Sequence, residues 1–379
     1  MAMSCDHSDL VPLEEALRRL WEALPAPASQ GVLADRDDPP SARAAMDGVA
    51  LRASEGRIPR RLLGTLFAGD DPSAVTVAPG TAVRVMTGAA MPTGADAIVP
   101  VEQITGEGGF VHPQVDPEPG DHVRPRAEQA HIGDLLLPEG APLTAARLAL
   151  CAQVGLPSDL PARIPVAVAS TGDELVPNPA SYQIRDSNGP MLAALAQRLG
   201  AEAHRWPALP DEPKALAAAL QNHGHTRILL TSGGVSAGEH DYLPGVLADL
   251  GATMLFHKIR LKPGKPMLAA LLGDLLVLGL PGNPVSAYLN ALIFLDHALA
   301  RLEGRRAPNP WRRARLATAI KNKGERPLLQ PCRLQEGELH TLGGKGSADL
   351  ITLAKADVCA WIEPGGMDSG VKTRYLPIL

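Results

Sequence analysis

The stretch ILLTSGGVS, residues 228–236, decides the fold of the second half of the chain. Its first four residues form an apolar run with the length and composition of a buried strand. The two glycines that follow, Gly233 and Gly234, let backbone N–H groups converge on an anion, and Ser232 and Ser236 add hydroxyl donors. A tight strand-to-helix turn without a ligand explains the segment equally well. The segment therefore predicts a strand end at which an anion site is one of two interpretations.

Strand and helix patterns alternate on both sides of this stretch. Alternation of this kind predicts a mostly parallel sheet with helices on both faces. Ligands of such open sheets bind beyond the carboxyl ends of the strands, so we expect the loops at those ends to form the site. The expected strands are 166–170, 228–231 and 275–280, and the expected helices are 191–199, 213–220, 242–250 and 284–302, the last with Pro284 in its first turn.

The first part of the chain has a different pattern. Apolar positions at helical spacing predict an amphipathic helix over 11–24, and Thr144 is a plausible N-cap for a second helix that ends near Gly155. Between them lie short β-prone runs such as 74–77 and 82–85, divided by Gly and Pro turns. Two helices that flank a β insert suggest a stalk carrying a lid. We expect a helical stalk or linker over 1–30 and 141–162, a β-rich lid over 31–140, an α/β domain over 163–305 and a small C-terminal β domain over 306–379.

Composition excludes several classes of function. Charged residues make up 20% of the chain and the net charge is −5, so there is no general basic field that would attract nucleic acid. The cysteines, at positions 5, 151, 332 and 359, form no CxxC pair and no zinc-like cluster, and we interpret them as reduced thiols. The N-terminus does not resemble a signal peptide, and the longest apolar stretch, 267–280, is too short to span a bilayer. We expect a cytoplasmic protein with no membrane partner.

A second candidate segment is rich in lysine. In KPGKP, residues 262–266, Lys262 and Lys265 stand three apart on a Pro-Gly turn, so their ammonium groups are presented in a fixed region. This arrangement favours an oxyanion ligand. A solvated basic loop is the alternative interpretation.

A third candidate segment joins an apolar strand to the start of a helix. In LPGNPVS, residues 280–286, the free N–H groups of the helix start and the hydroxyl of Ser286 face the same end of the sheet. The two prolines make the loop rigid, which lowers the entropy cost of binding. A stiffened helix start without a ligand remains the alternative. The candidate binding residues here are Pro281, Gly282, Asn283, Pro284 and Ser286.

Several carboxylates follow successive strands, as a Mg²⁺-nucleotide site requires. Glu174 ends the segment STGDE at 170–174, and Asp241 follows the glycine turn. Asp211 lies in a Pro-flanked turn at a helix start, where an acid is more often an N-cap than a functional group. Asp186 has the same ambiguity.

Taken together, SGGVS at 232–236, KPGKP at 262–266 and LPGNPVS at 280–286 closely resemble the molybdopterin molybdenumtransferase family, also called MoeA or the gephyrin E domain. The similarity extends almost end to end. AMDG at 45–48, RVMTGA at 84–89, STGDEL at 170–175 and GGKGS at 343–347 match further motifs of that family.

The resemblance implies a multidomain α/β fold. Its parts would be a central doubly wound, mostly parallel sheet of the molybdopterin-binding type, a helical stalk, a β-rich lid and a small C-terminal β-barrel-like domain. It also implies a homodimer that inserts molybdate into adenylylated molybdopterin and releases AMP, with Mg²⁺ assisting. Transient contact with other molybdenum-cofactor biosynthesis proteins is a further expectation.

The resemblance also implies roles for single residues. Lys262, Lys265 and Ser286 would grip a tetrahedral oxyanion, with Ser347 joining them. Thr87 would line the cleft from the lid. Metal or phosphoanhydride contacts would come from Asp47, Glu174 and Asp241, and further substrate contacts from Ser232, Gly233, Gly234, Ser236, Asp211, Pro281, Gly282, Asn283 and Pro284.

The chain departs from the family pattern at several positions. Gln129 replaces a frequent carboxylate, Val49 replaces a common tyrosine, and Pro331 stands where an arginine is often found, although Arg333 is close. Two alternatives follow. One is an adenylyltransferase acting on molybdopterin, although that enzyme is commonly the central domain alone. The other is a non-catalytic molybdopterin-binding relative, which the loss of charge at Gln129 would favour.

Overall fold

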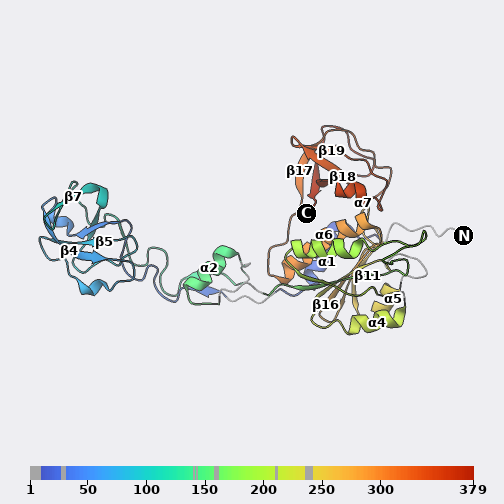
Figure 1. Cartoon of the computed structure of the whole chain (residues 1–379), viewed down its shortest axis with the longest axis horizontal. Coiled ribbons are helices and arrows are strands. Elements are labelled where there is room, and N and C mark those ends of the chain that lie inside the picture. The colour runs from blue at the N-terminus through green and yellow to red at the C-terminus, as the bar shows by residue number, and fades with distance from the viewer. Residues whose placement is uncertain are drawn as a thin grey trace. The chain divides into compact units, whose positions relative to one another are not determined.

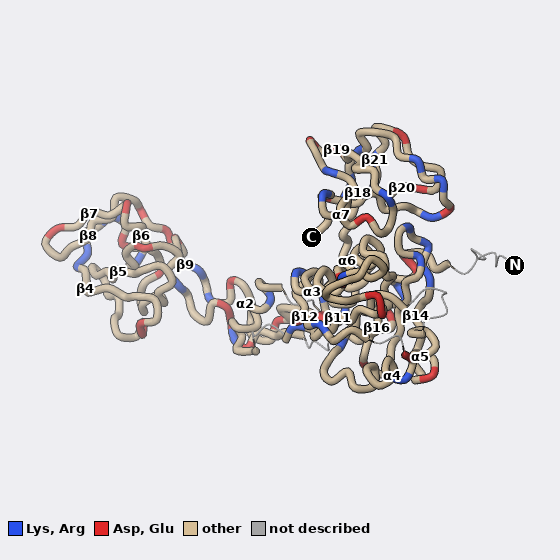
Figure 2. Tube along the Cα trace, turned by 45° about the vertical axis from the view of Figure 1, so that its right-hand side comes forward, with Lys and Arg blue, Asp and Glu red and all other residues tan. Residues whose placement is uncertain are grey.

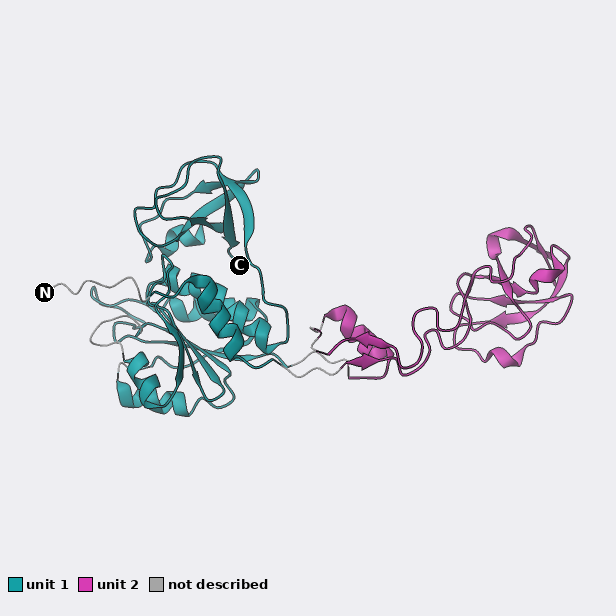
Figure 3. Ribbon diagram, turned by 180° about the vertical axis from the view of Figure 1, so that it is seen from behind, with its two compact units in different colours: residues 1–27, 161–379 teal, residues 28–160 magenta. Residues whose placement is uncertain are grey.

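The computed structural model describes residues 10–26, 31–139, 141, 144–157, 162–209, 212–234 and 242–379. It divides into two compact units, which Figure 3 colours separately: residues 1–27 with 161–379, and residues 28–160. Basic and acidic residues are interspersed along the trace of both units (Figure 2), in keeping with the small net charge of −5.

The larger unit contains a six-stranded sheet in the order β12-β11-β13-β16-β15-β14. The first four strands are parallel, and β15 and β14 run antiparallel to their neighbours. Three strands at the centre read as unbroken apolar runs because both of their faces are covered. The bounds are β11 (Pro165–Ser170), β12 (Glu202–Arg205), β13 (Ile228–Ser232), β14 (Thr253–His257), β15 (Leu268–Leu272) and β16 (Leu275–Leu280).

Helices cover both faces of this sheet (Figure 1). On β11, Val166 and Val168 point into a core shared with one set of helices, whereas Ala167 and Ala169 point into a second core on the other face. The first core is packed by α1 (Leu13–Ala23), α3 (Asn188–Arg198) and α6 (Pro284–Leu302), and the second by α4 (Pro213–Gln221) and α5 (Leu243–Asp249). The fold is therefore doubly wound, as the sequence predicted.

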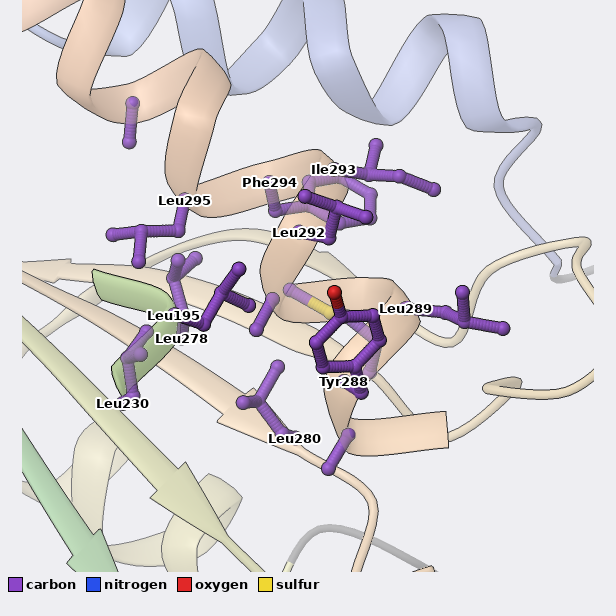
Figure 4. Packing of buried hydrophobic residues seen from close by; sticks show 14 of the residues in the cluster. Leu195, Leu230, Leu278, Leu280, Tyr288, Leu289, Leu292, Ile293, Phe294 and Leu295 are labelled. Carbon is purple, nitrogen blue, oxygen red and sulfur yellow. The ribbon is translucent and has the colours of Figure 1, made fainter. Parts of the chain in front are cut away.

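Helix α6 is the centre of the larger core. It begins directly after the 281–283 turn, and its proline at the first position lacks only an N–H that the helix could not have used. Figure 4 shows apolar side chains of this helix, among them Leu292 and Leu295, beside Leu278 and Leu280 of β16. Because the helix is so deeply buried, the 281–283 loop before it is fixed in place, and this loop carries candidate site residues.

The helices in the described part of the chain include none with the length and hydrophobicity of a membrane span.

The C-terminal part of the same unit is a closed barrel in the order β17-β19-β18-β20-β21. It is joined to the α/β part by a bridge between Lys262 and Leu328 and by a hydrogen bond from the Val285 N–H to the Ser347 carbonyl (3.1 Å). The bounds are β17 (Arg312–Leu316), β18 (Leu328–Gln335), β19 (Glu338–Thr341), α7 (Leu350–Ala354), β20 (Val358–Ile362) and β21 (Lys372–Pro377).

The smaller unit is built on a second six-stranded sheet, in the order β6-β3-β5-β4-β8-β7. Its close packing needs a glycine at Gly48, because a Cβ there would collide with the carbonyl oxygen of Val99 on the neighbouring strand. The bounds are β3 (Gly48–Leu51), β4 (Arg60–Leu66), β5 (Thr81–Val85), β6 (Ala97–Pro100), β7 (Ile104–Glu107) and β8 (Phe110–Pro113), with 3₁₀ turns at Ala53–Glu55, Pro72–Ala74 and Val101–Gln103.

The rest of this unit consists of two short ladders and a helix. Strand β1 (Val32–Leu33) pairs with β10 (Leu135–Leu137), and β2 (Arg43–Ala44) pairs with β9 (Val123–Arg124). Helix α2 (Ala145–Gln153) begins where expected, with the Thr144 hydroxyl accepting a hydrogen bond from the Arg147 N–H (3.3 Å).

The expected strand over 74–77 is wrong. Asp71 caps a 3₁₀ turn at Pro72–Ala74 by accepting a hydrogen bond from the Ser73 N–H (2.9 Å), and only an isolated bridge from Thr76 to Thr93 follows. The local cap competes successfully with the β propensity of the run. Strands β12, β14 and β15 were not anticipated, because their sequences show no clear alternation.

Candidate functional site

Strands β11, β13 and β16 end side by side, with Ser170, Ser232 and Leu280 in register. The three loops that follow these strands carry the STGDE, SGG and PGN segments. They lie at the carboxyl edge of the sheet, where ligands of open α/β folds bind.

The loops enclose a cavity of about 490 Å³, here called the glycine cavity. It is lined by all three loops and by the segment before α3. Its lining includes the candidate residues Glu174, Ser232, Gly233, Gly234, Gly282, Asn283 and Pro284, together with Ser170, Thr171, Gly172, Asp186, Asn188 and Ala348.

The glycine turn is required by close packing. Gly233 and Gly234 have φ angles of 103° and 69°, which favour glycine. A Cβ at Gly233 would lie 2.5 Å from the Thr171 hydroxyl, and the Gly233 N–H donates to the Leu280 carbonyl (3.0 Å). The turn thus packs directly against the neighbouring strand ends.

Asn188, which was not anticipated, holds two of the loops together. Its Nδ2 donates to the Ser232 hydroxyl (2.6 Å) and to the Gly282 carbonyl (2.7 Å). Its Oδ1 is buried and has no hydrogen-bond partner among the described residues.

The two acids of this cavity have different surroundings. Asp186 accepts hydrogen bonds from the Ser170 hydroxyl (2.9 Å) and the Gly189 N–H (2.8 Å), and it pairs with Arg205 (2.6 Å). These contacts tie its carboxylate to α3 and β12. The Glu174 carboxylate, by contrast, has no hydrogen bond or ion pair with another described residue and packs against Gly172.

A second cavity, of about 560 Å³, lies where the α/β part meets the barrel and is here called the lysine cavity. Its lining includes the candidate residues Lys262, Lys265, Pro281, Asn283, Ser286 and Ser347, together with Arg326, Gln330, Pro331, Asp349 and Thr352. Neither lysine forms an ion pair with another described residue. Their charges are therefore available to an anion.

The turn that carries the lysines is held on three sides. The Lys262 N–H donates to the Pro327 carbonyl (2.9 Å), and the Lys265 carbonyl accepts from the Ile259 N–H (2.9 Å). The fully buried side chain of Asn290, on α6, donates to the Gly264 carbonyl (3.0 Å). A Cβ at Gly264 would lie 2.6 Å from this amide. The lysine backbone is therefore fixed before any ligand arrives.

The two cavities adjoin at Asn283, which lines both. Its Nδ2 donates to the Ser347 hydroxyl (3.0 Å). Ser347 belongs to a loop braced by Asp349, which accepts from the Lys345 N–H (2.9 Å), the Thr352 N–H (3.1 Å) and the Thr352 hydroxyl (2.7 Å). These bonds, led by the Thr352 hydroxyl, lower the pKa of the Asp349 carboxyl. Ser286 is 2% exposed at the base of the lysine cavity.

In the smaller unit, the structure brings together the two candidate residues Asp47 and Thr87. The Asp47 carboxylate accepts hydrogen bonds from both the N–H and the hydroxyl of Thr87, each at 2.7 Å. These bonds, first that from the Thr87 N–H and then that from its hydroxyl, lower the pKa of the Asp47 carboxyl.

Three candidate residues, Asp211, Ser236 and Asp241, lie outside the described residues. In the part of the chain that the structure describes, no three His, Cys, Asp or Glu side chains gather as a ready metal cluster.

The three departures from the family pattern fall in different surroundings. Val49 is buried in a core of the smaller unit. The Gln129 amide, oriented to satisfy both neighbours, donates to Asp38 (2.8 Å) and accepts from Arg124 (2.7 Å). Pro331 lines the lysine cavity, and the guanidinium in that lining belongs to Arg326 and not to Arg333.

Fold and site together define a class of protein. The chain has an open, doubly wound α/β sheet with two adjoining cavities, one at the carboxyl edge of the sheet and one where the α/β part meets the barrel. Three family models match successive parts of it: the MoeA N-terminal region (domain I and II) over residues 5–155, a probable molybdopterin binding domain over 167–301, and the MoeA C-terminal region (domain IV) over 313–371.

Relatives support the same assignment. The chain is 36% identical to the molybdopterin molybdenumtransferase of Synechococcus elongatus, covering 86% of this chain and 84% of that protein. It is 31% identical to that of Haemophilus influenzae, covering 97% and 98%. The crystal structure of a molybdopterin biosynthesis MoeA protein from Pyrococcus horikosii superposes with a TM-score of 0.75 at 26% identity, over 97% of this chain and 99% of that one.

The chain belongs to the molybdopterin molybdenumtransferase (MoeA) family. It is a transferase enzyme with a role in molybdenum cofactor biosynthesis.

Proposed function

We propose that the enzyme inserts molybdate into adenylylated molybdopterin, with release of AMP and formation of the molybdenum cofactor. The observation that carries this proposal is the junction at Asn283, where a cavity suited to a phosphorylated ligand adjoins a cavity suited to an oxyanion. A reaction between a nucleotide-activated pterin and molybdate needs two such sites in contact.

The glycine cavity suits the adenylylated pterin. It lies at the carboxyl edge of the sheet and is lined by the glycine turn and by the start of α6, the kind of place where open α/β folds bind anionic ligands. Ser236, Asp211 and Asp241 belong to this proposal as substrate-side residues.

The lysine cavity suits molybdate. Lys262 and Lys265 supply charge, and Ser286 and Ser347 supply hydroxyl donors at its walls. Because the barrel contributes Ser347, an α/β domain alone would lack this cavity. The proposal therefore favours the transferase over an adenylyltransferase built from the central domain.

Positioning supplies most of the catalysis in this account. The two dithiolene thiols of the pterin bind molybdenum and one molybdate oxygen leaves as water. Hydrolysis of the phosphoanhydride consumes one water and yields AMP and the pterin phosphate. The protein contributes a preorganised set of N–H groups and cations that stabilise the negative charge of both reactants.

We include Mg²⁺ in the proposal because the glycine cavity offers the kind of donor that this ion prefers. Mg²⁺ is commonly held by one or two carboxylates together with substrate phosphates. Glu174, which is unpaired among the described residues and lines that cavity, fits this requirement. Asp241 and Asp47 are the other carboxylates that we assign to metal or phosphoanhydride contact, and the hydrogen bonds from Thr87 lower the pKa of the Asp47 carboxyl. The bound ion would neutralise phosphoanhydride charge.

We further propose that the enzyme works as a cytoplasmic homodimer, with Thr87 lining the substrate cleft. Transient contact with other cofactor-biosynthesis proteins would deliver its substrate and receive its product. The size of the assembly can be measured by sedimentation, and a monomer at micromolar concentration would contradict the dimer.

The experiment that tests the function mixes purified protein, adenylylated molybdopterin, Mg²⁺ and molybdate, and measures AMP. We expect AMP release that depends on molybdate. Retention of the ester without AMP release would favour the non-catalytic alternative. Formation of the ester from molybdopterin and ATP would favour the adenylyltransferase.

A further inference from the structure

The lysine cavity carries more positive charge than the lysine pair alone. Arg326 lines it together with Lys262 and Lys265, and Asp349 is the single carboxylate in the lining. That carboxylate already accepts hydrogen bonds from Lys345 and Thr352, so its lone pairs face its own loop. The cavity therefore has an excess of two positive charges, which matches a divalent tetrahedral oxyanion.

Arg326 is built into the same wall as the lysine turn. Its Nη1 donates to the carbonyl of Leu261, the residue directly before Lys262 (2.8 Å). Its own carbonyl accepts from the buried amide of Asn322 (2.9 Å). The next residue, Pro327, accepts from the Lys262 N–H (2.9 Å). The guanidinium is thus held at a fixed place beside the lysine turn.

Most of the hydrogen-bonding capacity of this guanidinium is unused. An arginine side chain carries five N–H donors, and one of those of Arg326 is engaged with Leu261. Within the described part of the chain, Arg326 forms no ion pair. A half-buried guanidinium without a carboxylate is expensive unless an anion compensates it, and its planar fork suits two oxygens of one ligand.

We propose that Arg326 is an oxyanion-binding residue of the lysine cavity, and that its guanidinium contacts molybdate together with Lys262 and Lys265. This inference rests on the proposed function only for the identity of the anion. The neighbouring Pro331 lines the same cavity with an apolar ring and offers no donor. The residues of β18 that line the cavity are uncharged, and Arg326, two residues before this strand, supplies the guanidinium.

The test measures binding of molybdate alone by calorimetry, without any pterin, so that its outcome is independent of turnover. Arg326→Gln removes the charge and keeps a donor for the Leu261 carbonyl. We expect molybdate affinity to fall about 10-fold or more, the range typical of a lost hydrogen bond to a charged group. Arg326→Lys, which keeps the charge and loses the planar fork, should lie between that variant and the wild type.

A matched control is Arg333→Gln, which removes the same charge from β18 at an exposed position outside the cavity lining. It should bind molybdate like the wild type. Equal weakening by Arg333→Gln and Arg326→Gln would reduce the effect to general electrostatics and overturn the proposal. Unchanged affinity in Arg326→Gln would overturn it directly.

A rescue variant separates ion contact from a purely structural role. Pro331→Arg places a guanidinium on the same cavity wall, so the double variant Arg326→Gln/Pro331→Arg should regain most of the lost affinity. A double variant with the melting temperature of the wild type and no regained affinity would show that Arg326 acts only through the Leu261 carbonyl. Wild-type protein that binds molybdate but releases no AMP would contradict the proposed function and leave Arg326 in its role.

Discussion

The amide of Asn283 donates a hydrogen bond to the hydroxyl of Ser347 (3.0 Å), across 64 residues of sequence. This bond joins the N-cap residue of α6 to the glycine-rich loop of the barrel, at the place where the two cavities adjoin. It therefore joins the wall of the glycine cavity to the wall of the lysine cavity.

Replacing Ser347 with Ala should weaken molybdate binding. The variant removes the acceptor for Asn283 and one hydroxyl of the lysine cavity, and a neutral hydrogen bond is worth about 0.5–1.5 kcal/mol. We expect the KM for molybdate to rise about 2- to 10-fold, with little change in the KM for the adenylylated pterin. Ser369→Ala, an exposed serine of the barrel outside the cavity lining, is the control. Equal effects of the two variants would remove Ser347 from the account.

Replacing Lys265 with Ala should abolish the dependence of AMP release on molybdate. The lysine is half-buried in the cavity, and its charge acts where screening by salt is weak. The defect should persist at high ionic strength, as measured by steady-state kinetics over a salt series. The control is Lys321→Ala, which removes a lysine charge from an exposed position. Unchanged turnover in Lys265→Ala would exclude this lysine from the site.

Replacing Asn290 with Ala should lower both stability and molybdate affinity. The Gly264 carbonyl would lose its buried partner, at a cost of about 1–3 kcal/mol. The melting temperature should fall, and the KM for molybdate should rise more than the KM for the pterin, because the lysine turn rests on this amide. Asn222→Ala, which removes an exposed bond to the Ala218 carbonyl, should change neither KM. A normal KM for molybdate in Asn290→Ala would show that the lysine turn keeps its conformation without the Asn290 amide.

Much of the sheet and most of the helices could be predicted from sequence because their patterns are local. Helix α6 and strand β16 have the predicted bounds, since a proline start and an unbroken apolar run specify them within a few residues. Strand β12 (Glu202–Arg205) was missed because it is short and polar. The strand expected at 74–77 fails because the side chain of Asp71 caps the preceding turn.

The candidate site was predictable only where a motif carried it. The lysine turn and the glycine turn are contiguous in sequence. Arg326, in contrast, enters the lysine cavity through pairing of Lys262 with Leu328, which no local pattern reveals. Asn188 was overlooked for the same reason, because its partners Ser232 and Gly282 come from two other strand ends.

The stability of the larger unit should depend on pH through His297. Burial lowers the pKa of this imidazole, although its hydrogen bond to the Leu17 carbonyl acts in the opposite direction. A histidine whose pKa is depressed on folding contributes stability that is present above its unfolded value of 6.5 and is lost as the pH falls through the folded pKa. The melting temperature should therefore drop between pH 7.5 and about 5.5.

His297→Phe is the variant that isolates this effect. It keeps a ring against Trp21, whose centroid lies 5.0 Å from the imidazole, and it cannot titrate. The difference in melting temperature between variant and wild type should move in favour of the variant as the pH is lowered. An identical pH profile for both proteins would show that His297 titrates normally in the folded state.

A single-turnover experiment tests directly whether AMP release is coupled to insertion of molybdenum. Enzyme in excess over adenylylated molybdopterin is mixed with Mg²⁺ and molybdate, and AMP and pterin-bound molybdenum are quantified in the same sample. We expect AMP and pterin-bound molybdenum to appear together, in equal amounts and at the same rate. Neither should appear when molybdate is omitted. Release of AMP without molybdate, or AMP without molybdenum on the pterin, would contradict this coupling.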